Sequence, residues 1–207
     1  MKLTCTLSLL LSVSTLTVSA QIKVTNLKPT DISKSVRYDG KVINAARFSD
    51  RAGEHLIITT ETGERPSKDK DFDGRDADLY AYHYAVNGAA YKQTWQMHDF
   101  IKDCPVDIWA QYLPNTFAIT DLDKNGVAEV WLMYKTVCHG DVSPSTMKII
   151  MHEGDKKYAV RGTNMVKVPG EQYGGSYTFD ATFKAGPEVF RKYAADLWKK
   201  NLLETWK

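Results

Sequence analysis

Oxygen-bearing side chains recur at alternate positions between residues 121 and 129. Calcium takes roughly six to eight oxygen ligands, and alternate residues of a tight loop direct their side chains toward one centre. Gly126, at the sixth place, permits a backbone reversal that turns the next carbonyl toward the same centre. The spacing therefore predicts a structural calcium site, although Asp-Asn-Gly segments also form ordinary turns. The predicted ligands are Asp121, Asp123, Asn125, Val127 through its carbonyl oxygen, and Glu129.

A second acidic segment, residues 69–78, has a similar spacing of carboxylates. It departs from the first at the ninth place, where Ala77 stands, so a neighbouring aspartate would have to supply that ligand. A weaker metal site and a solvated loop between strands both fit this pattern. The candidate ligands are Asp69, Asp71, Asp73, Asp76 and Asp78.

Side chains with catalytic potential are scattered along the chain. Cys138 and His139 are adjacent, but adjacent residues of a strand point to opposite faces, which argues against a Cys/His nucleophile. An enzyme acting on carbohydrate would need two facing carboxylates, for example Asp141 and Glu153, whose pairing does not follow from their spacing. Aromatic side chains could form a sugar-stacking face, although they more often fill a core. These aromatic residues are Trp95, Trp109, Trp131, Tyr80, Tyr82 and Tyr84.

The elements that would position these residues are mostly strands. Short β-branched and aromatic runs alternate with Gly, Asp and Asn clusters, which is typical of antiparallel sheets. Turns at Asn87-Gly88 and Glu153-Gly154-Asp155 predict two hairpins. The pattern of strand, acidic turn, strand and hairpin occurs twice, over residues 42–100 and 115–162. We therefore predict a mainly β fold with two four-stranded antiparallel sheets, each like one propeller blade.

The acidic loop also resembles known repeats. Residues Ile119 to Val130 are similar to the calcium loop of FG-GAP and VCBS propeller repeats, which have an acid at the ninth place and lead into a strand. Asn125 stands where that pattern has an acid, and two units are too few to close a propeller. The longer run from Phe117 to Arg161 is similar to a family of small exported bacterial proteins labelled surface polysaccharide biosynthesis proteins. This resemblance implies a process at the cell envelope rather than a particular reaction.

The periodicity changes near the C-terminus. After Pro187, apolar residues recur at spacings of one, three and four, which predicts an amphipathic helix over residues 187–205. Its other face is rich in Lys and Arg, so it could lie on a membrane surface. A single terminal helix in a β protein more often covers a sheet, and we predict that role here.

The N-terminus has the pattern of a secretory signal peptide. Lys2 precedes an apolar stretch that ends in the small residues Ser19 and Ala20, which predicts cleavage after Ala20. A buried N-terminal helix is the alternative. Export implies an oxidising compartment, where the two remaining cysteines, Cys104 and Cys138, are expected to form a disulfide rather than to stay as reactive thiols.

The remaining chain, residues 21–207, is long enough for one domain with a core, and no Pro-, Ser- or Gly-rich linker divides it. After the loss of Lys2 it has 26 basic and 25 acidic residues, so it has no strong field that would favour nucleic acid. The sequence also predicts no transmembrane segment. We expect a secreted or periplasmic, non-catalytic binding or assembly module, with polysaccharide or an envelope protein as partner. A carbohydrate-active envelope enzyme is the alternative.

Overall fold

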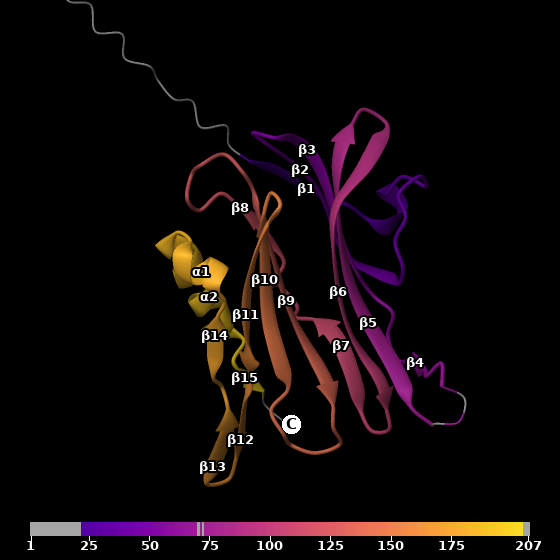
Figure 1. Ribbon diagram of the computed structural model, residues 1–207, viewed down its shortest axis with the longest axis vertical. Coiled ribbons are helices and arrows are strands. Elements are labelled where there is room, and N and C mark those ends of the chain that lie inside the picture. Colours follow the sequence, from indigo (N-terminus) through magenta and orange to yellow (C-terminus); the bar gives the residue numbers. More distant parts are fainter. Residues whose placement is uncertain (1–21, 70, 72, 205–207) are drawn as a thin grey trace, which may run out of the picture.

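The computed structural model describes residues 22–69, 71 and 73–204. The fold is mainly β, as predicted, with two antiparallel sheets packed against each other and two short helices on the outer side of the second sheet (Figure 1). The predicted signal peptide, residues 1–20, lies outside the described residues. Among the helices of the described ranges, none has the length and apolarity needed to cross a bilayer.

The first sheet contains six strands and follows the predicted hairpins. Its order is β1-β2-β3-β5-β4, and β6 pairs with the other edge of β5. A short 3-10 turn, η1 (Pro29–Asp31), lies between β1 and β2. The strands are β1 (Lys23–Asn26), β2 (Lys41–Asp50), β3 (Gly53–Glu61), β4 (Arg65–Pro66), β5 (Arg75–Asn87) and β6 (Ala90–Cys104).

The second sheet also contains six strands. Its order is β14-β11-β10-β9-β7, and the short β8 pairs with β9 next to the acidic loop. The strands are β7 (Ile108–Tyr112), β8 (Ala118–Thr120), β9 (Glu129–Cys138), β10 (Thr146–Glu153), β11 (Lys156–Thr163) and β14 (Tyr177–Phe179).

The prediction of four strands in each sheet is therefore too low. Within these larger sheets, the two predicted segments contain the antiparallel units β2-β3-β5-β6 and β8-β9-β10-β11. Strands β1 and β4 extend the first unit, while β7 and β14 extend the second. Strands β1 and β14 cover the edge strands β2 and β11. Strand β7 pairs with β9 beyond the short β8, and β4 comes from within the first predicted repeat and pairs with the start of β5.

The C-terminal region contains the predicted helix and a small third sheet. Helix α2 (Glu188–Lys200) begins after Pro187 as expected, but it ends at Lys200 instead of residue 205. The chain then forms β15, which pairs in parallel with β12, and β12 pairs with β13. These elements are α1 (Ala181–Ala185), β12 (Met165–Val168), β13 (Glu171–Gly174) and β15 (Leu203–Glu204).

Side-chain alternation along the strands separates three apolar clusters. On β5, Leu79 and Ala81 face the core between the two sheets, whereas Tyr82 and Tyr84 face a smaller cluster on the outer side of the first sheet. The third cluster lies between the second sheet and the helices. Phe190, Ala194 and Trp198 of α2 are buried there, so the helix covers the sheet as predicted.

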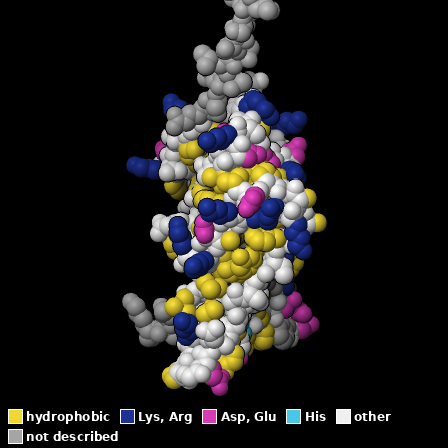
Figure 2. Space-filling view, turned by 90° about the vertical axis from the view of Figure 1, so that its left-hand side faces the viewer, with side chains coloured by type: hydrophobic (Ala, Val, Ile, Leu, Met, Phe, Trp, Pro, Cys, Tyr) yellow, Lys and Arg dark blue, Asp and Glu magenta, His cyan; other side chains and the backbone are white. Residues whose placement is uncertain are grey.

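The helix-bearing side carries Lys and Arg side chains among separate apolar patches (Figure 2). A disulfide between Cys104 and Cys138 joins the end of β6 to the end of β9, with 5.8 Å between the two Cα atoms. This confirms the predicted pairing and fastens the two sheets to each other at one end. Closing such a loop restricts the unfolded chain by about 3–4 kcal/mol in the chain-entropy description.

Candidate metal centre

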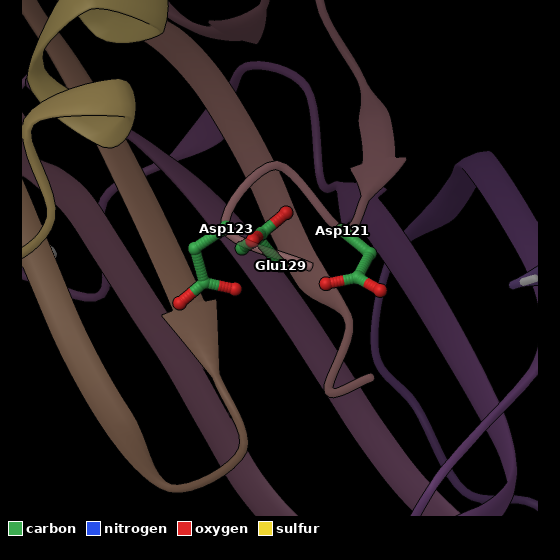
Figure 3. A group of neighbouring side chains, drawn as sticks. All are labelled: Asp121, Asp123 and Glu129. Atoms are coloured by element: carbon green, nitrogen blue, oxygen red, sulfur yellow. The ribbon is translucent and has the colours of Figure 1, made fainter. Parts of the chain in front are cut away.

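Three of the five predicted ligands come together in the loop between β8 and β9. Asp121, Asp123 and Glu129 each have a carboxylate oxygen within 4.8 Å of the corresponding oxygens of the other two. Figure 3 shows Glu129 between the two aspartates, which extend from the loop above it. Such a group of hard, anionic oxygens is the donor set that Ca²⁺ prefers.

The backbone of the loop is arranged around these carboxylates. Lys124 and Gly126 have positive φ angles of 60° and 80°, which reverse the chain as the position of the glycine predicted. The Gly126 N–H donates to both carboxylate oxygens of Asp121, at 3.3 and 3.2 Å, and the Asn125 N–H donates to Asp123 at 3.2 Å. The loop therefore holds two of its acids by its own amide groups.

Glu129 is the first residue of β9 and is fully buried. Its carboxylate accepts hydrogen bonds from the Thr120 hydroxyl at 2.5 Å and from the Leu122 N–H at 2.9 Å. The Trp131 indole in turn donates to the Thr120 hydroxyl at 2.8 Å. Burial raises the pKa of Glu129, and the nearby Asp123 carboxylate adds to this rise, although the hydrogen bonds oppose it.

Asp123 is also held in an unfavourable environment for its charge. Burial raises its pKa, and the neighbouring carboxylates of Glu153 and Asp121 raise it further. Glu153 is the direct cross-strand partner of Glu129 in the β9-β10 pairing, so a fourth acid borders the loop. This role of Glu153 does not follow from the sequence, because the register that places the two glutamates opposite each other is set by strand pairing in the sheet.

Asn125, a fourth predicted ligand, is placed differently. The Asn125 side chain accepts from the Val127 N–H at 2.7 Å and donates to Asp123 at 2.9 Å and to Glu153 at 2.5 Å. The amide oxygen of Asn125 is thus used within the loop rather than directed at the three carboxylates. It would have to give up the bond to Val127 in order to bind an ion.

The loop is also fastened to the first sheet. Asp50, at the end of β2, accepts from the Ala128 N–H at 2.9 Å, and the Arg51 N–H donates to the Gly126 carbonyl at 2.8 Å. Asp50 also accepts from His55 at 2.9 Å. Burial alone would raise the pKa of Asp50, but the bonds from Ala128, the Ala52 N–H and His55 outweigh it and lower the pKa. The acidic loop therefore connects the turns of the two repeats.

The second acidic segment does not form a comparable group. Asp76 and Asp78 belong to β5 and are almost fully buried, and their carboxylates face basic side chains. Lys102 lies 3.1 Å from Asp76, while His98 lies 2.7 Å from Asp78 and Arg65 forms a further ion pair with it. Burial opposes the ionised state of both aspartates, yet these partners lower their pKa values.

The remaining aspartates of that segment, Asp69, Asp71 and Asp73, are exposed, and the Asp71 N–H donates to Asp69 at 3.0 Å. Within the described ranges, the only group of three or more His, Cys, Asp or Glu side chains close enough to share a metal ion is the cluster of residues 121, 123 and 129. Of the five carboxylates of the second segment, two are thus buried and paired with basic side chains, and three lie in an exposed loop.

Most of the aromatic residues considered for sugar stacking lie in the core. Trp131 is fully buried under the helices, and Tyr82 and Tyr84 are buried on the first sheet. Trp95 is sandwiched between two imidazoles, with ring centroids 5.0 Å from His83 and 4.0 Å from His152. Trp95 therefore packs in the core between the two sheets, whereas Trp131 packs under the helices and Tyr82 and Tyr84 pack on the outer side of the first sheet.

The suggested catalytic groups are also separated. The Cys138 sulfur is bound in the disulfide, so it has no thiol to act as a nucleophile. Asp141 precedes β10 and Glu153 ends it, so the two carboxylates lie near opposite ends of an eight-residue strand. At roughly 3.3 Å per residue the strand between them is about 25 Å long, which separates these carboxylates too widely to act on one glycosidic bond.

Comparison of the chain with family models, with curated proteins and with solved structures finds no match.

Proposed function

We propose that this protein is an exported, calcium-stabilised β module with a binding or assembly role at the bacterial cell envelope, connected with surface polysaccharide. The observation that supports calcium binding is the convergence of three carboxylates within 4.8 Å, in a loop that is hydrogen-bonded to both sheets. Asp123 and Glu129 both have raised pKa values because of burial and neighbouring negative charge. A bound cation would relieve this repulsion.

The proposed site uses Asp121, Asp123 and Glu129 directly, and Asn125 and the Val127 carbonyl complete it after a local rotation. The residues of the chain supply the positioning: Thr120 and Leu122 orient Glu129, while Gly126 orients Asp121. Because Asp50 and Arg51 hold the same loop, an ordered loop strengthens the junction between the sheets. The role of the ion is therefore structural rather than catalytic.

The proposed location at the cell envelope and the proposed connection with polysaccharide rest on the sequence. The signal-like N-terminus favours export, and the disulfide is compatible with an oxidising compartment. The resemblance of residues 117–161 to exported proteins labelled for surface polysaccharide biosynthesis favours a connection of this protein with surface polysaccharide. The wide separation of Asp141 and Glu153 removes the carboxylate pair considered for an enzyme, so the non-catalytic module is the better supported role.

Calcium-dependent thermal unfolding tests the proposal. At about 1 mM Ca²⁺ and a dissociation constant near 0.1 mM, typical of extracellular sites, binding adds about 1.4 kcal/mol to the free energy of unfolding. For a chain of this size the melting temperature should rise by about 3–6 °C relative to protein in chelator. Mg²⁺ at the same concentration should have a smaller effect, because it requires stricter octahedral geometry.

A melting temperature that is the same in Ca²⁺ and in chelator, together with no heat of calcium binding in calorimetry, would reject the site. Binding of extracted envelope polysaccharide, measured in Ca²⁺ and in chelator, tests the polysaccharide role separately. We expect binding in calcium, and its complete absence would reject the polysaccharide role while leaving the metal site intact.

A further inference from the structure

A polar pocket of about 310 Å³ lies where the edge of the first sheet meets the segment that leads into β8. Three asparagines line it, and each comes from a different part of the chain: Asn26 from the end of β1, Asn44 from β2 and Asn115 from the segment after β7. Phe117 supplies an aromatic surface. All of the residues that line the pocket are uncharged at any pH.

A β-bulge shapes the β2 side of this pocket. The β2-β3 register shifts between Val42 and Asn44, so Ile43 is the extra residue and is 40% exposed. Bulges redirect neighbouring side chains and are frequent beside functional sites. Here the Asn44 backbone N–H and side-chain Nδ2 both donate to the Thr59 hydroxyl, at 3.0 and 2.9 Å. This fixes the side chain and leaves its carbonyl oxygen as an acceptor.

A tight turn positions the asparagine on the other side. Pro114 and Asn115 occupy the two central places, and Asn115 has a φ of 59°, a conformation that Asn and Gly accept most easily. The Thr116 hydroxyl donates to the Leu113 carbonyl at 2.6 Å and closes this turn. The turn explains why asparagine is favoured at position 115. It does not explain the choice of asparagine at positions 26 and 44.

The hydrogen-bonding groups of this pocket are largely unused. In the described part of the chain, the side-chain amides of Asn26 and Asn115 have no hydrogen-bond partner, and neither has the Asn44 carbonyl oxygen. Together they present donors and acceptors from three directions around an uncharged hollow. The volume is near the lower end of the range of about 300–1,000 Å³ for small-molecule sites.

From this arrangement we infer that the pocket binds a neutral sugar residue of a glycan. Each sugar hydroxyl both donates and accepts a hydrogen bond, which matches carboxamide groups, and the apolar face of a sugar ring can pack on Phe117. An acidic sugar or a phosphate would instead call for Arg or Lys, which the lining lacks. The inference rests on the proposed connection with polysaccharide for its biological setting, and it names the ligand class and the residues that bind it.

Binding of defined oligosaccharides to the folded protein in calcium tests this inference. The probes are neutral gluco-, galacto- and manno-configured oligosaccharides, with oligosaccharides containing uronic acid for comparison, measured by ligand-observed NMR. We expect binding of at least one neutral series. Asn115→Gly removes one amide while it preserves the left-handed backbone, and Asn26→Ala removes a second amide from the exposed edge. Each should weaken binding by about three- to tenfold.

Gln93→Ala is the matched control, because Gln93 is an exposed amide on β6 outside the pocket lining. It should leave the affinity unchanged. Thermal unfolding of all three variants verifies that they are folded and still respond to calcium. Binding of neutral glycans that both asparagine variants retain in full would overturn the pocket assignment but not the polysaccharide role. Binding of acidic glycans alone, or of no glycan at all, would overturn the inference itself.

Discussion

The two acidic segments of this protein have nearly the same spacing of aspartates but opposite surroundings. Between β8 and β9, Asp121, Asp123 and Glu129 face one another, and Glu153 adds a fourth negative charge nearby. At the start of β5, Asp76 and Asp78 instead face Lys102, Arg65 and His98. The pKa values of Asp123 and Glu129 are raised, whereas those of Asp76 and Asp78 are lowered.

This difference shows that the number of carboxylates in a segment does not decide the net charge of their surroundings. The first segment retains negative charge that a metal ion could neutralise. In the second, the buried Asp76 and Asp78 are already paired with basic side chains from β4 and β6. Experiments that remove one acid from each segment should therefore have different consequences.

The comparison is clearest above pH 6.5, because buried histidines dominate the stability in acid. Burial lowers the pKa of His83 to about 3 and that of His152 to about 4, and the two residues lie between the sheets on either side of Trp95. Both are neutral in the folded state and become protonated in the unfolded state below about pH 6.5. We expect the free energy of unfolding to fall as the pH drops from 6.5 toward 4, by roughly 5–6 kcal/mol for the two residues together.

His152→Phe isolates this effect. It keeps an aromatic ring on Trp95, and it also removes a buried Nδ1 that has no hydrogen-bond partner within the described residues. Urea unfolding should show a change of less than about 1.5 kcal/mol at pH 7 and a clearly smaller loss at pH 4.5 than in the wild type. If both proteins lose the same free energy of unfolding between pH 7 and pH 4.5, His152 does not contribute to the loss of stability in acid.

The second-largest effect should come from Asp78→Asn. The substitution leaves Arg65 and Lys102 beside a neutral side chain that is only 1% exposed as Asp78. We expect a loss of about 2–3 kcal/mol in urea unfolding, less than for a fully buried pair, because the cationic partners are about one-third exposed. The loss should be the same in calcium and in chelator.

Asp73→Asn is the control for this experiment, since Asp73 is exposed in the same acidic segment. It should change the stability by no more than about 0.5 kcal/mol. A calcium-dependent loss in Asp78→Asn would mean that the second segment binds the ion after all, and it would remove the contrast between the two segments.

The smallest effect on the calcium-free protein should come from Asp123→Asn. This change removes one of several facing negative charges, so the stability in chelator should stay the same or rise by a few tenths of a kcal/mol. The increase in melting temperature on adding Ca²⁺ should disappear. Asp69→Asn, an exposed aspartate at the first place of the second segment, should keep the full increase. Retention of the calcium response in Asp123→Asn would locate the ion elsewhere.

Local sequence patterns were enough to predict much of the fold. The Asn87-Gly88 and Gly154 turns predicted the β5-β6 and β10-β11 hairpins, and the apolar spacing after Pro187 predicted α2. The four-stranded unit was only part of each sheet. Strands β1, β4, β7 and β14 are short, and their pairing depends on edges that the neighbouring units provide rather than on their own composition.

The sequence by itself determined the chemistry available in the acidic loop, because alternate oxygen-bearing residues and Gly126 are local features of nine consecutive positions. Only the tertiary structure decided which acids lie beside basic side chains and which lie beside other acids. Lys102 and Arg65 reach Asp76 and Asp78 through strand pairing, and Glu153 reaches the first loop through the β9-β10 register. The physical reason is that charge interactions depend on distance in space, and residues far apart in the chain become neighbours only when the sheets form.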